Sequence, residues 1–189
     1  MPKLWSETIE AHRRAVHEAI LEAGHTLAVE RGVGSVTMSE VAARAGIGRA
    51  TLYKYFPDVE SILVARHQRH VAAHLEQLER LRDQAPTAAA RLEAVLTGFA
   101  FAAHHRRDHG STEVSALVHR REHIAPAEAQ LAALITSVLA EAAADGTVRA
   151  DVPPAELASF CMHALAAAAG LPDGAAVHRL VALTLSGLR

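Results

Sequence analysis

Cationic, hydroxyl and aromatic side chains gather between residues 37 and 56 of this 189-residue chain. If residues 49–56 form a short helix, its outward side carries Arg49, Thr51, Tyr53, Lys54 and Tyr55. Arginine can read guanine edges or hold a phosphate, and threonine and tyrosine hydroxyls donate to phosphate oxygens. This set has the chemistry of groove and phosphate contacts with DNA. The plain alternative is a helical hairpin whose tyrosines pack and whose charges are solvated.

Thirteen histidines form the second group that could do chemistry. His119, Glu122 and His123 spell H-x-x-E-H, in which two histidines one helical turn apart bind zinc and the glutamate acts as base. A histidine-centred metal-binding protein or metallohydrolase is therefore the alternative function, although no third ligand is identifiable. A regulatory metal site would draw on a wider set: His104, His105, His109, Glu113, His119 and His123. The favoured interpretation is a solvated polar surface, with no metal, no cofactor and no enzymatic activity.

The elements that must position these residues are helices. Alanine, the best helix former, occurs 41 times, and apolar residues recur at three- and four-residue steps. These patterns predict an all-α chain of about nine helices with no convincing strand. The predicted helices cover residues 7–30, 39–45, 49–56, 58–84, 86–103, 112–123, 126–145, 154–170 and 175–188.

Single residues mark several of the expected helix ends. Ser39 is the predicted N-cap of the second helix, Asp58 caps the fourth, and Pro126 is a first-turn proline. Gly46 lies where the break between the two short helices needs a positive φ, which glycine adopts without steric cost. Residues 39–56 therefore have the helix-turn-helix layout, with Leu52 and other apolar residues facing inward.

Charge and cysteine content narrow the class of protein. One cysteine excludes a disulfide framework, and no apolar leader or membrane-length apolar run is visible, which predicts a cytoplasmic protein without membrane contact. The net charge of −2 argues against a general nucleic-acid binder. However, residues 1–70 hold nine bases against eight acids, whereas residues 71–189 hold ten against 13. DNA binding would therefore depend on a few placed contacts.

The run Thr37-x3-Val41-Ala42-x2-Ala45-Gly46-Ile47-x3-Thr51-Leu52-Tyr53-x-Tyr55-Phe56 resembles the signature of the TetR family of bacterial transcription regulators. This resemblance implies an all-helical homodimer with a helix-turn-helix DNA-binding domain, residues 1–57, and an effector-binding and dimerisation domain, residues 58–189. It also implies a repressor that a small-molecule effector releases from a palindromic double-stranded DNA operator. The residues implied at the DNA are Thr37, Ser39, Arg49, Ala50, Thr51, Tyr53, Lys54 and Tyr55.

The resemblance extends to the second domain through helix count and length. The last two helices would pair with their copies in a dimer interface that includes Ala158, Ala164, Ala168, Val177, Leu180, Val181, Thr184 and Leu188. An effector pocket among the preceding helices would be lined by Leu75, Leu78, Val95, Phe99, Phe101, Leu117, Leu134 and Phe160. For each of them plain core is the favoured interpretation, because an apolar residue at helical spacing usually packs against its neighbours.

Two positions depart from the family pattern. Val59 stands where a phosphate-binding lysine is frequent, and Gly48 stands where a serine often caps the recognition helix. The absence of the lysine puts the affinity for the DNA phosphate backbone in doubt. It also leaves open a third possibility, a ligand-binding or dimerisation protein that has kept the fold without operator binding.

Overall fold

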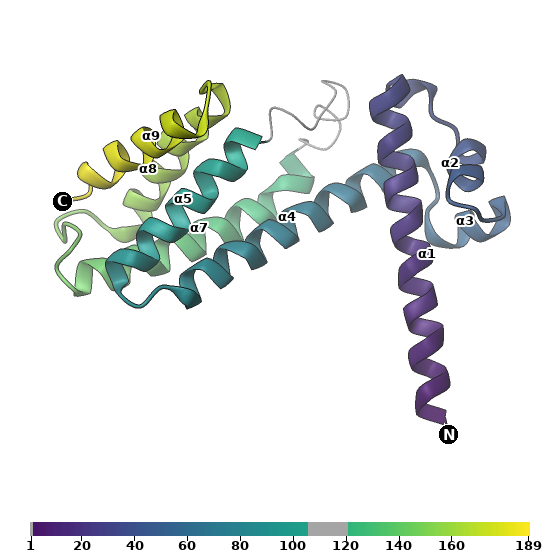
Figure 1. Ribbon diagram of the computed structural model, residues 1–189, viewed down its shortest axis with the longest axis horizontal. Helices are drawn as coiled ribbons and strands as arrows, with labels where there is room; N and C mark the ends of the chain where they lie inside the picture. The colour runs from purple at the N-terminus through teal and green to yellow at the C-terminus, as the bar shows by residue number, and fades with distance from the viewer. Residues whose placement is uncertain (1, 106–120) are drawn as a thin grey trace. The chain divides into compact units, whose positions relative to one another are not determined.

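All regular structure in the described part of the chain is helical, which confirms the all-α prediction. The computed structural model describes the backbone of residues 2–105 and 121–189, and the side chains of residues 9–105 and 126–189. These stretches contain eight α-helices and two short 3₁₀ helices (Figure 1). The elements are α1 (Pro2–Arg31), η1 (Val33–Ser35), α2 (Met38–Arg44), α3 (Arg49–Tyr55), α4 (Val59–Gln84), α5 (Ala88–His105), α7 (Arg121–Ala144), α8 (Pro154–Ala166), η3 (Ala167–Gly170) and α9 (Gly174–Ser186).

The chain divides into two compact units, and the first, called the head below, includes residues 9–70 among those with described side chains. The predicted domain boundary at residues 57 and 58 lies inside this unit. The first turns of α4 belong to it because Ile62 is fully buried in the same cluster as Leu21 of α1 and Leu52 of α3. Burial of such aliphatic side chains supplies about 1.5–3 kcal/mol each, so the start of α4 is part of the head's core.

The crossing of α1 and α4 is close because Gly24 lies in it. A Cβ built on Gly24 would come within 2.6 Å of Ile62 Cγ2, well inside van der Waals contact. Glycine therefore allows the two helices to pack directly over the core of the first unit. Ion pairs add to this contact, since Arg66 Nε lies 2.8 Å from Glu22 Oε1 and Arg69 pairs with Glu18.

The second unit, which includes residues 71–105 and 126–189, has its own core around α5. This helix contacts η3, α8 and α9, and its buried face carries Leu92, Val95, Leu96, Phe99 and Ala103. That face is the stripe that the sequence pattern predicts for this helix. The core is completed by α7 with Ile135, Val138 and Leu139 and by α8 and α9. An ion pair between Arg91 and Glu141, at 3.1 Å, joins α5 to α7.

Helix α7 begins earlier than the sequence indicates. Pro126 lies inside this helix and is not a first-turn residue, so the prediction of a start at Pro126 was wrong. A proline inside a helix loses the hydrogen bond of its N–H and its ring crowds the carbonyl four residues earlier, so α7 continues through Pro126 at a cost in stability. The stretch Pro126–Ala144 is also long and apolar enough, at a mean hydropathy of 1.2, to cross a membrane by length and composition. Three of its residues, Ile135, Val138 and Leu139, are fully buried in the core of the second unit.

Candidate nucleic-acid interface and ligand groove

The turn between α2 and α3 is fixed by backbone hydrogen bonds. Gly46 has φ 69°, the left-handed conformation that the sequence predicts there. The Ile47 N–H donates to the Ala42 carbonyl at 3.0 Å, and the Gly46 N–H donates to the Ala43 carbonyl at 3.2 Å. This pair of bonds is the Schellman ending of a helix. It sets the direction in which the chain leaves α2 and enters α3.

Thr37, not Ser39, is the N-cap of α2, so the predicted cap position was wrong. The Thr37 hydroxyl accepts from the Glu40 N–H at 3.3 Å, and the Thr37 N–H donates to Glu40 Oε2 at 3.0 Å. The Thr-x-x-Glu spacing of a capping box therefore overrides the serine. Hydrogen bonds from Thr37, and then the charge of Arg31, hold the pKa of the Glu40 carboxyl below its ordinary value. The Thr37 hydroxyl also donates its proton to Glu40 at 2.8 Å, so a phosphate bond from it would have to displace this contact.

Helix α3 has one buried and one exposed side. Leu52 and the following Phe56 are buried in the head's core, while Arg49, Ala50, Thr51, Tyr53 and Lys54 are exposed. Tyr53, with 49% of its surface exposed, is among the most exposed large hydrophobic residues that the structure describes. As expected, Gly48 gives α3 no side-chain cap. The exposed side therefore presents two cations, a hydroxyl and a phenol with no core role.

Tyr55 does not belong fully to this exposed set. It is half-buried, packs against the core cluster of the head, and its ring centroid lies 6.3 Å from that of His17 on α1. The expectation of an outward Tyr55 was wrong in that respect, because Tyr55 lies three residues after the buried Leu52 and so shares its helix face. Burial, and then the nearby Arg69 charge, lower the pKa of His17, so the imidazole is neutral at pH 7.

The histidine strings of the alternative function find no support in the described residues. The His119, Glu122 and His123 side chains lie outside them, as do His109 and Glu113. His104 Nδ1 lies 3.1 Å from the Ala168 carbonyl, and His105 Nδ1 lies 2.8 Å from the Phe101 carbonyl, which are contacts of helix side chains with backbone. Among the residues with described side chains, no group of three or more His, Cys, Asp or Glu could hold a metal ion.

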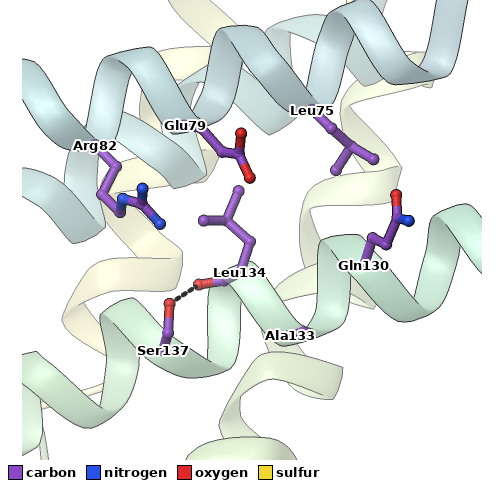
Figure 2. A pocket seen from close by; sticks show the side chains of 7 residues that line it. All are labelled: Leu75, Glu79, Arg82, Gln130, Ala133, Leu134 and Ser137. Atoms are coloured by element: carbon purple, nitrogen blue, oxygen red, sulfur yellow. Dashed lines mark hydrogen bonds between the residues drawn. The ribbon is translucent and has the colours of Figure 1, made fainter. Parts of the chain in front are cut away.

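A groove of about 340 Å³ lies between α4 and α7 in the second unit (Figure 2). Leu75 and Leu134, two residues of the predicted effector pocket, line it. Figure 2 shows the Glu79 and Leu134 side chains pointing into the space between the helices, with the Ser137 hydroxyl turned back to donate to the Leu134 carbonyl at 2.8 Å. The remaining lining residues, which sequence reasoning missed, are Glu79, Arg82, Gln130, Ala133 and Ser137.

The other predicted pocket residues lie elsewhere. Leu78, Val95 and Phe99 are buried in the core, and Phe101 packs against it with its ring 5.0 Å from that of His178. Phe160 is 49% exposed, so its assignment to an internal pocket was wrong, while Leu117 is outside the described residues. Hydrophobic periodicity marks the buried side of a helix and cannot tell a packed neighbour from an open space.

The predicted dimer residues of α8 and α9 point mostly inward. Six are buried in the chain's own core, and the expectation that they face a partner was wrong: they are Ala158, Ala168, Val177, Val181, Thr184 and Leu188. Ala164 and Leu180 are partly buried. The exposed apolar residues of this helix pair are Phe160 and, at 69%, Leu183. A Cβ on Gly187 would lie 3.9 Å from Phe160 Cζ, so the Phe160 ring reaches over the end of α9.

Two family models account for most of the chain. Residues 20–65 match the model of bacterial regulatory proteins of the tetR family, and residues 85–189 match the C-terminal domain of SbtR-like transcriptional regulators. The second match alone covers more than half of the chain. The chain belongs to the TetR family of bacterial transcription regulators.

Curated relatives match about a third of this TetR-family chain. An uncharacterized HTH-type transcriptional regulator of Mycobacterium bovis is 41% identical over 59 residues, which are 31% of each chain. An HTH-type regulator of Staphylococcus aureus is 32% identical over 66 residues, which are 35% of this chain and 36% of the relative. The matched stretch thus spans about a third of these relatives.

Solved structures of TetR regulators share the fold over about nine-tenths of the chain. The fatty acid degradation regulator FadR from Bacillus halodurans superposes with a TM-score of 0.73 at 19% identity, covering 92% of this chain and 96% of that one. FadR from Bacillus subtilis, in complex with stearoyl-CoA, gives 0.67 at 17% identity, covering 91% and 99%. At these identities the likeness concerns the TetR fold alone.

Proposed function

We propose that this protein is a repressor that binds a palindromic DNA operator as a homodimer and is released from it by a small-molecule effector. The observation that carries this proposal is the exposed side of α3, where Arg49, Thr51, Tyr53 and Lys54 have no role in the core. The protein acts in the cytoplasm as a regulator and not as an enzyme. Its partners are double-stranded DNA, the effector and a second copy of the chain.

In the proposed complex α3 lies in the major groove. Arg49, at the helix N-terminus, reads a base edge, while Thr51 and Tyr53 donate to phosphates or base edges and Ala50 permits close approach. Lys54 binds a phosphate as a point charge. The half-buried Tyr55 contributes at most its hydroxyl at the groove edge, and Thr37 and the exposed Ser39 contact the flanking backbone. The two heads of a dimer address half-sites about 34–36 Å apart.

The groove between α4 and α7 is our candidate effector site. Its volume of about 340 Å³ lies at the lower end of ligand pockets, about 300–1,000 Å³. Apolar Leu75 and Leu134 would hold the body of a ligand, while Glu79 and Arg82 would orient its polar end. An effector bound here stabilises one arrangement of α4 against α7. It releases DNA only if it binds that arrangement better than the DNA-competent one.

The proposed dimer uses the outer face of α8 and α9. Phe160 and Leu183 are large apolar residues that the chain leaves in contact with water, and small residues such as Ala182 surround them. An interface built on such a face gains free energy from burying them, at about 25 cal/mol per Å² of apolar area. A twofold protein matches a palindromic operator. This face replaces the inward residues that the family resemblance implied.

The DNA proposal is tested by selecting bound duplexes from a random pool and measuring affinity for the winning sequence. Arg49→Ala should weaken binding to that sequence by about 1–3 kcal/mol and relax preference at one base pair, since a bidentate base contact is lost. Lys54→Ala should weaken binding to all sequences alike. A wild-type protein that prefers no duplex over random DNA would reject the proposal.

The effector site is tested by filling the groove. Ala133→Trp places an indole between α4 and α7, whereas Ala140→Trp, also exposed on α7, does not line the groove. Stearoyl-CoA is a reasoned first probe, because the Bacillus subtilis neighbour was solved with it; shorter acyl-CoA esters and free acids complete the panel. For a compound that releases the wild type from DNA, we expect Ala133→Trp to bind DNA but resist release, and Ala140→Trp to respond normally. Equal response of both variants would place the effector elsewhere.

A further inference from the structure

The lysine and arginine side chains of the head fall into two groups. Residues 9–70 contain eight of them, and four are ion-paired: Arg31 with Glu40, Arg44 with Glu30, Arg66 with Glu22 and Arg69 with Glu18. The other four form no ion pair among the described residues, and they are Arg13, Arg14, Arg49 and Lys54. Two of these unpaired cations lie on the recognition helix. The other two lie on α1, outside the helix-turn-helix.

The part of α1 that carries Arg13 and Arg14 has no packing role. All side chains from residue 9 to residue 15 are exposed, including Ile9 at 53%, and burial in the core begins at Ile20. The family-model match also begins only at residue 20. A helical stretch that buries nothing is held by little more than its backbone bonds. The stability of the core therefore does not explain why this part of α1 is helical or why it carries two arginines.

His17 fixes where this stretch lies relative to α3 within the head. Its ring centroid is 5.2 Å from that of Phe56 and 6.3 Å from that of Tyr55, so His17 faces the C-terminal end of α3. Arg13 and Arg14 precede His17 by four and three residues. Residues at these spacings share a helix face, and the rise of about 1.5 Å per residue places them about one turn beyond the contact. Both guanidinium groups thus lie on the side of α1 that faces the end of α3, where Lys54 is exposed.

We propose that Arg13 and Arg14 bind backbone phosphates beside the groove that α3 enters, extending the DNA interface along α1. This inference rests on the proposed function, because it needs α3 to dock on DNA. Duplex DNA carries one negative charge about every 1.7 Å of its length, so phosphates lie within reach of both arginines beside the groove that α3 enters. An unpaired guanidinium can hold a phosphate with two parallel bonds, whereas Arg31 or Arg44 would first have to leave a glutamate.

Glu10 is the acid among the described side chains of the exposed stretch, residues 9–15. Glu10 lies four residues before Arg14 on the exposed stretch, and no ion pair between them is present. Its charge reduces the attraction of the arginine pair for phosphate. Replacing it therefore provides a change of opposite sign, which a loss of folding or of helix structure in α1 could not imitate.

The experiment measures how affinity for the selected operator duplex depends on salt, by fluorescence anisotropy between 50 and 300 mM NaCl. Arg13→Gln/Arg14→Gln removes two cations from α1. Arg80→Gln/Arg149→Gln removes two from the second unit, where each is ion-paired at the surface with Glu76 or Asp151. Arg13→Lys/Arg14→Lys keeps the charge, and Glu10→Gln removes the opposing acid. Circular dichroism checks that every variant keeps its helix content.

We expect the slope of log K against log salt to fall by about 0.9 for each phosphate contact, or about 1.8 per head in the α1 Gln variant. Sequence preference should stay, because phosphate contacts carry none. The Lys variant should keep the wild-type slope, and Glu10→Gln should bind more tightly than wild type. An α1 Gln variant with the slope of the second-unit control overturns the inference while Arg49→Ala still tests the proposed function. A wild type without sequence preference rejects both.

Discussion

The head and the α8–α9 pair were equally easy to recognise as helices but not equally easy to orient. In the head, the residues expected inside, such as Val41, Leu52 and Phe56, are buried, and Arg49 and Lys54 are exposed. In α8 and α9 the helices lie where they were expected, yet Val177 and Val181, expected at a partner, are buried in the chain's own core. The difference teaches that a helix face can be assigned only where polar residues mark the other side.

The composition of the two outer faces explains this outcome. Helix α3 has charged or hydroxyl residues on its outer side, so its single apolar stripe can be recognised from the sequence. The outer side of α8 and α9 carries alanines, Phe160 and Leu183 interspersed with polar residues, so apolar residues occur on both sides of each helix. Cys161 belongs to the inner stripe: burial raises the pKa of its thiol to about 11, which leaves it protonated at neutral pH.

The largest expected effect comes from placing a charge on each stripe of α9. Val177→Asp puts a carboxylate into a fully buried apolar site, and we expect a loss of unfolding free energy of about 4 kcal/mol or more. Leu183→Asp puts the same charge at a residue that is 69% exposed, and we expect a folded protein whose dimer is lost. Urea unfolding and sedimentation velocity measure the two results.

His178→Asp is a control, since His178 is exposed on the same helix but lies five residues before Leu183, about 140° around the helix axis. It tests whether any acid on α9 weakens the dimer. A Leu183→Asp protein that remains dimeric would contradict the assignment of the outer face. A Val177→Asp protein that is both stable and dimeric would contradict the assignment of Val177 to the inner, buried face.

A smaller effect is expected at the α1–α4 crossing of the head. Gly24→Val places a branched side chain against the equally stiff Ile62, and we expect a loss of roughly 2–3 kcal/mol from overpacking. Gly34→Val adds the same side chain where no atom lies within 4 Å of a Cβ, so its effect should stay within about 0.5 kcal/mol. Urea midpoints compare them, and equal losses would show that the close crossing does not limit stability.

Sequence reasoning reached further in the head than in the second unit. The Gly46 turn, the missing cap at Gly48 and the Asp58 cap, which accepts from the Ser61 N–H at 2.7 Å, could all be read from local residue preferences. The contact of Gly24 with Ile62 could not, because nothing in the chain tells which residue 38 positions away fills the space above a glycine.

The ligand groove shows the same limit. Leu75 and Leu134 were found because they are apolar at helical spacing, but Glu79, Arg82 and Gln130 look like ordinary solvated residues of α4 and α7. These residues are close together because α4 and α7 lie side by side, and a single sequence contains no direct signal for that arrangement. The polar groups that would give an effector its orientation are thus the part of the site that only a structure reveals.

The smallest expected effect concerns the start of α2, where local reasoning in the head was wrong. Thr37→Ala removes the cap of α2 and should cost about 1 kcal/mol, whereas Ser39→Ala changes an exposed residue inside the helix and should cost less than about 0.5 kcal/mol. Urea unfolding at pH 7 compares the variants. A larger loss for Ser39→Ala would restore the serine as the cap.

The same contact has a pH dependence whose sign follows from Glu40. Hydrogen bonds from Thr37 lower the pKa of Glu40 in the folded state below its ordinary value of 4.5, so the ionised carboxylate stabilises the fold above that pH. This stabilisation is lost as the pH falls through the lowered pKa, because protonation removes the carboxylate that accepts these bonds. We therefore expect the gap in stability between the wild type and Glu40→Gln to be constant from pH 7 to 5 and to shrink below about pH 4.5, measured by urea unfolding at each pH. A gap that stays unchanged down to pH 3.5 would mean that the carboxylate charge contributes nothing to the cap and that the hydrogen-bond geometry alone holds the start of α2.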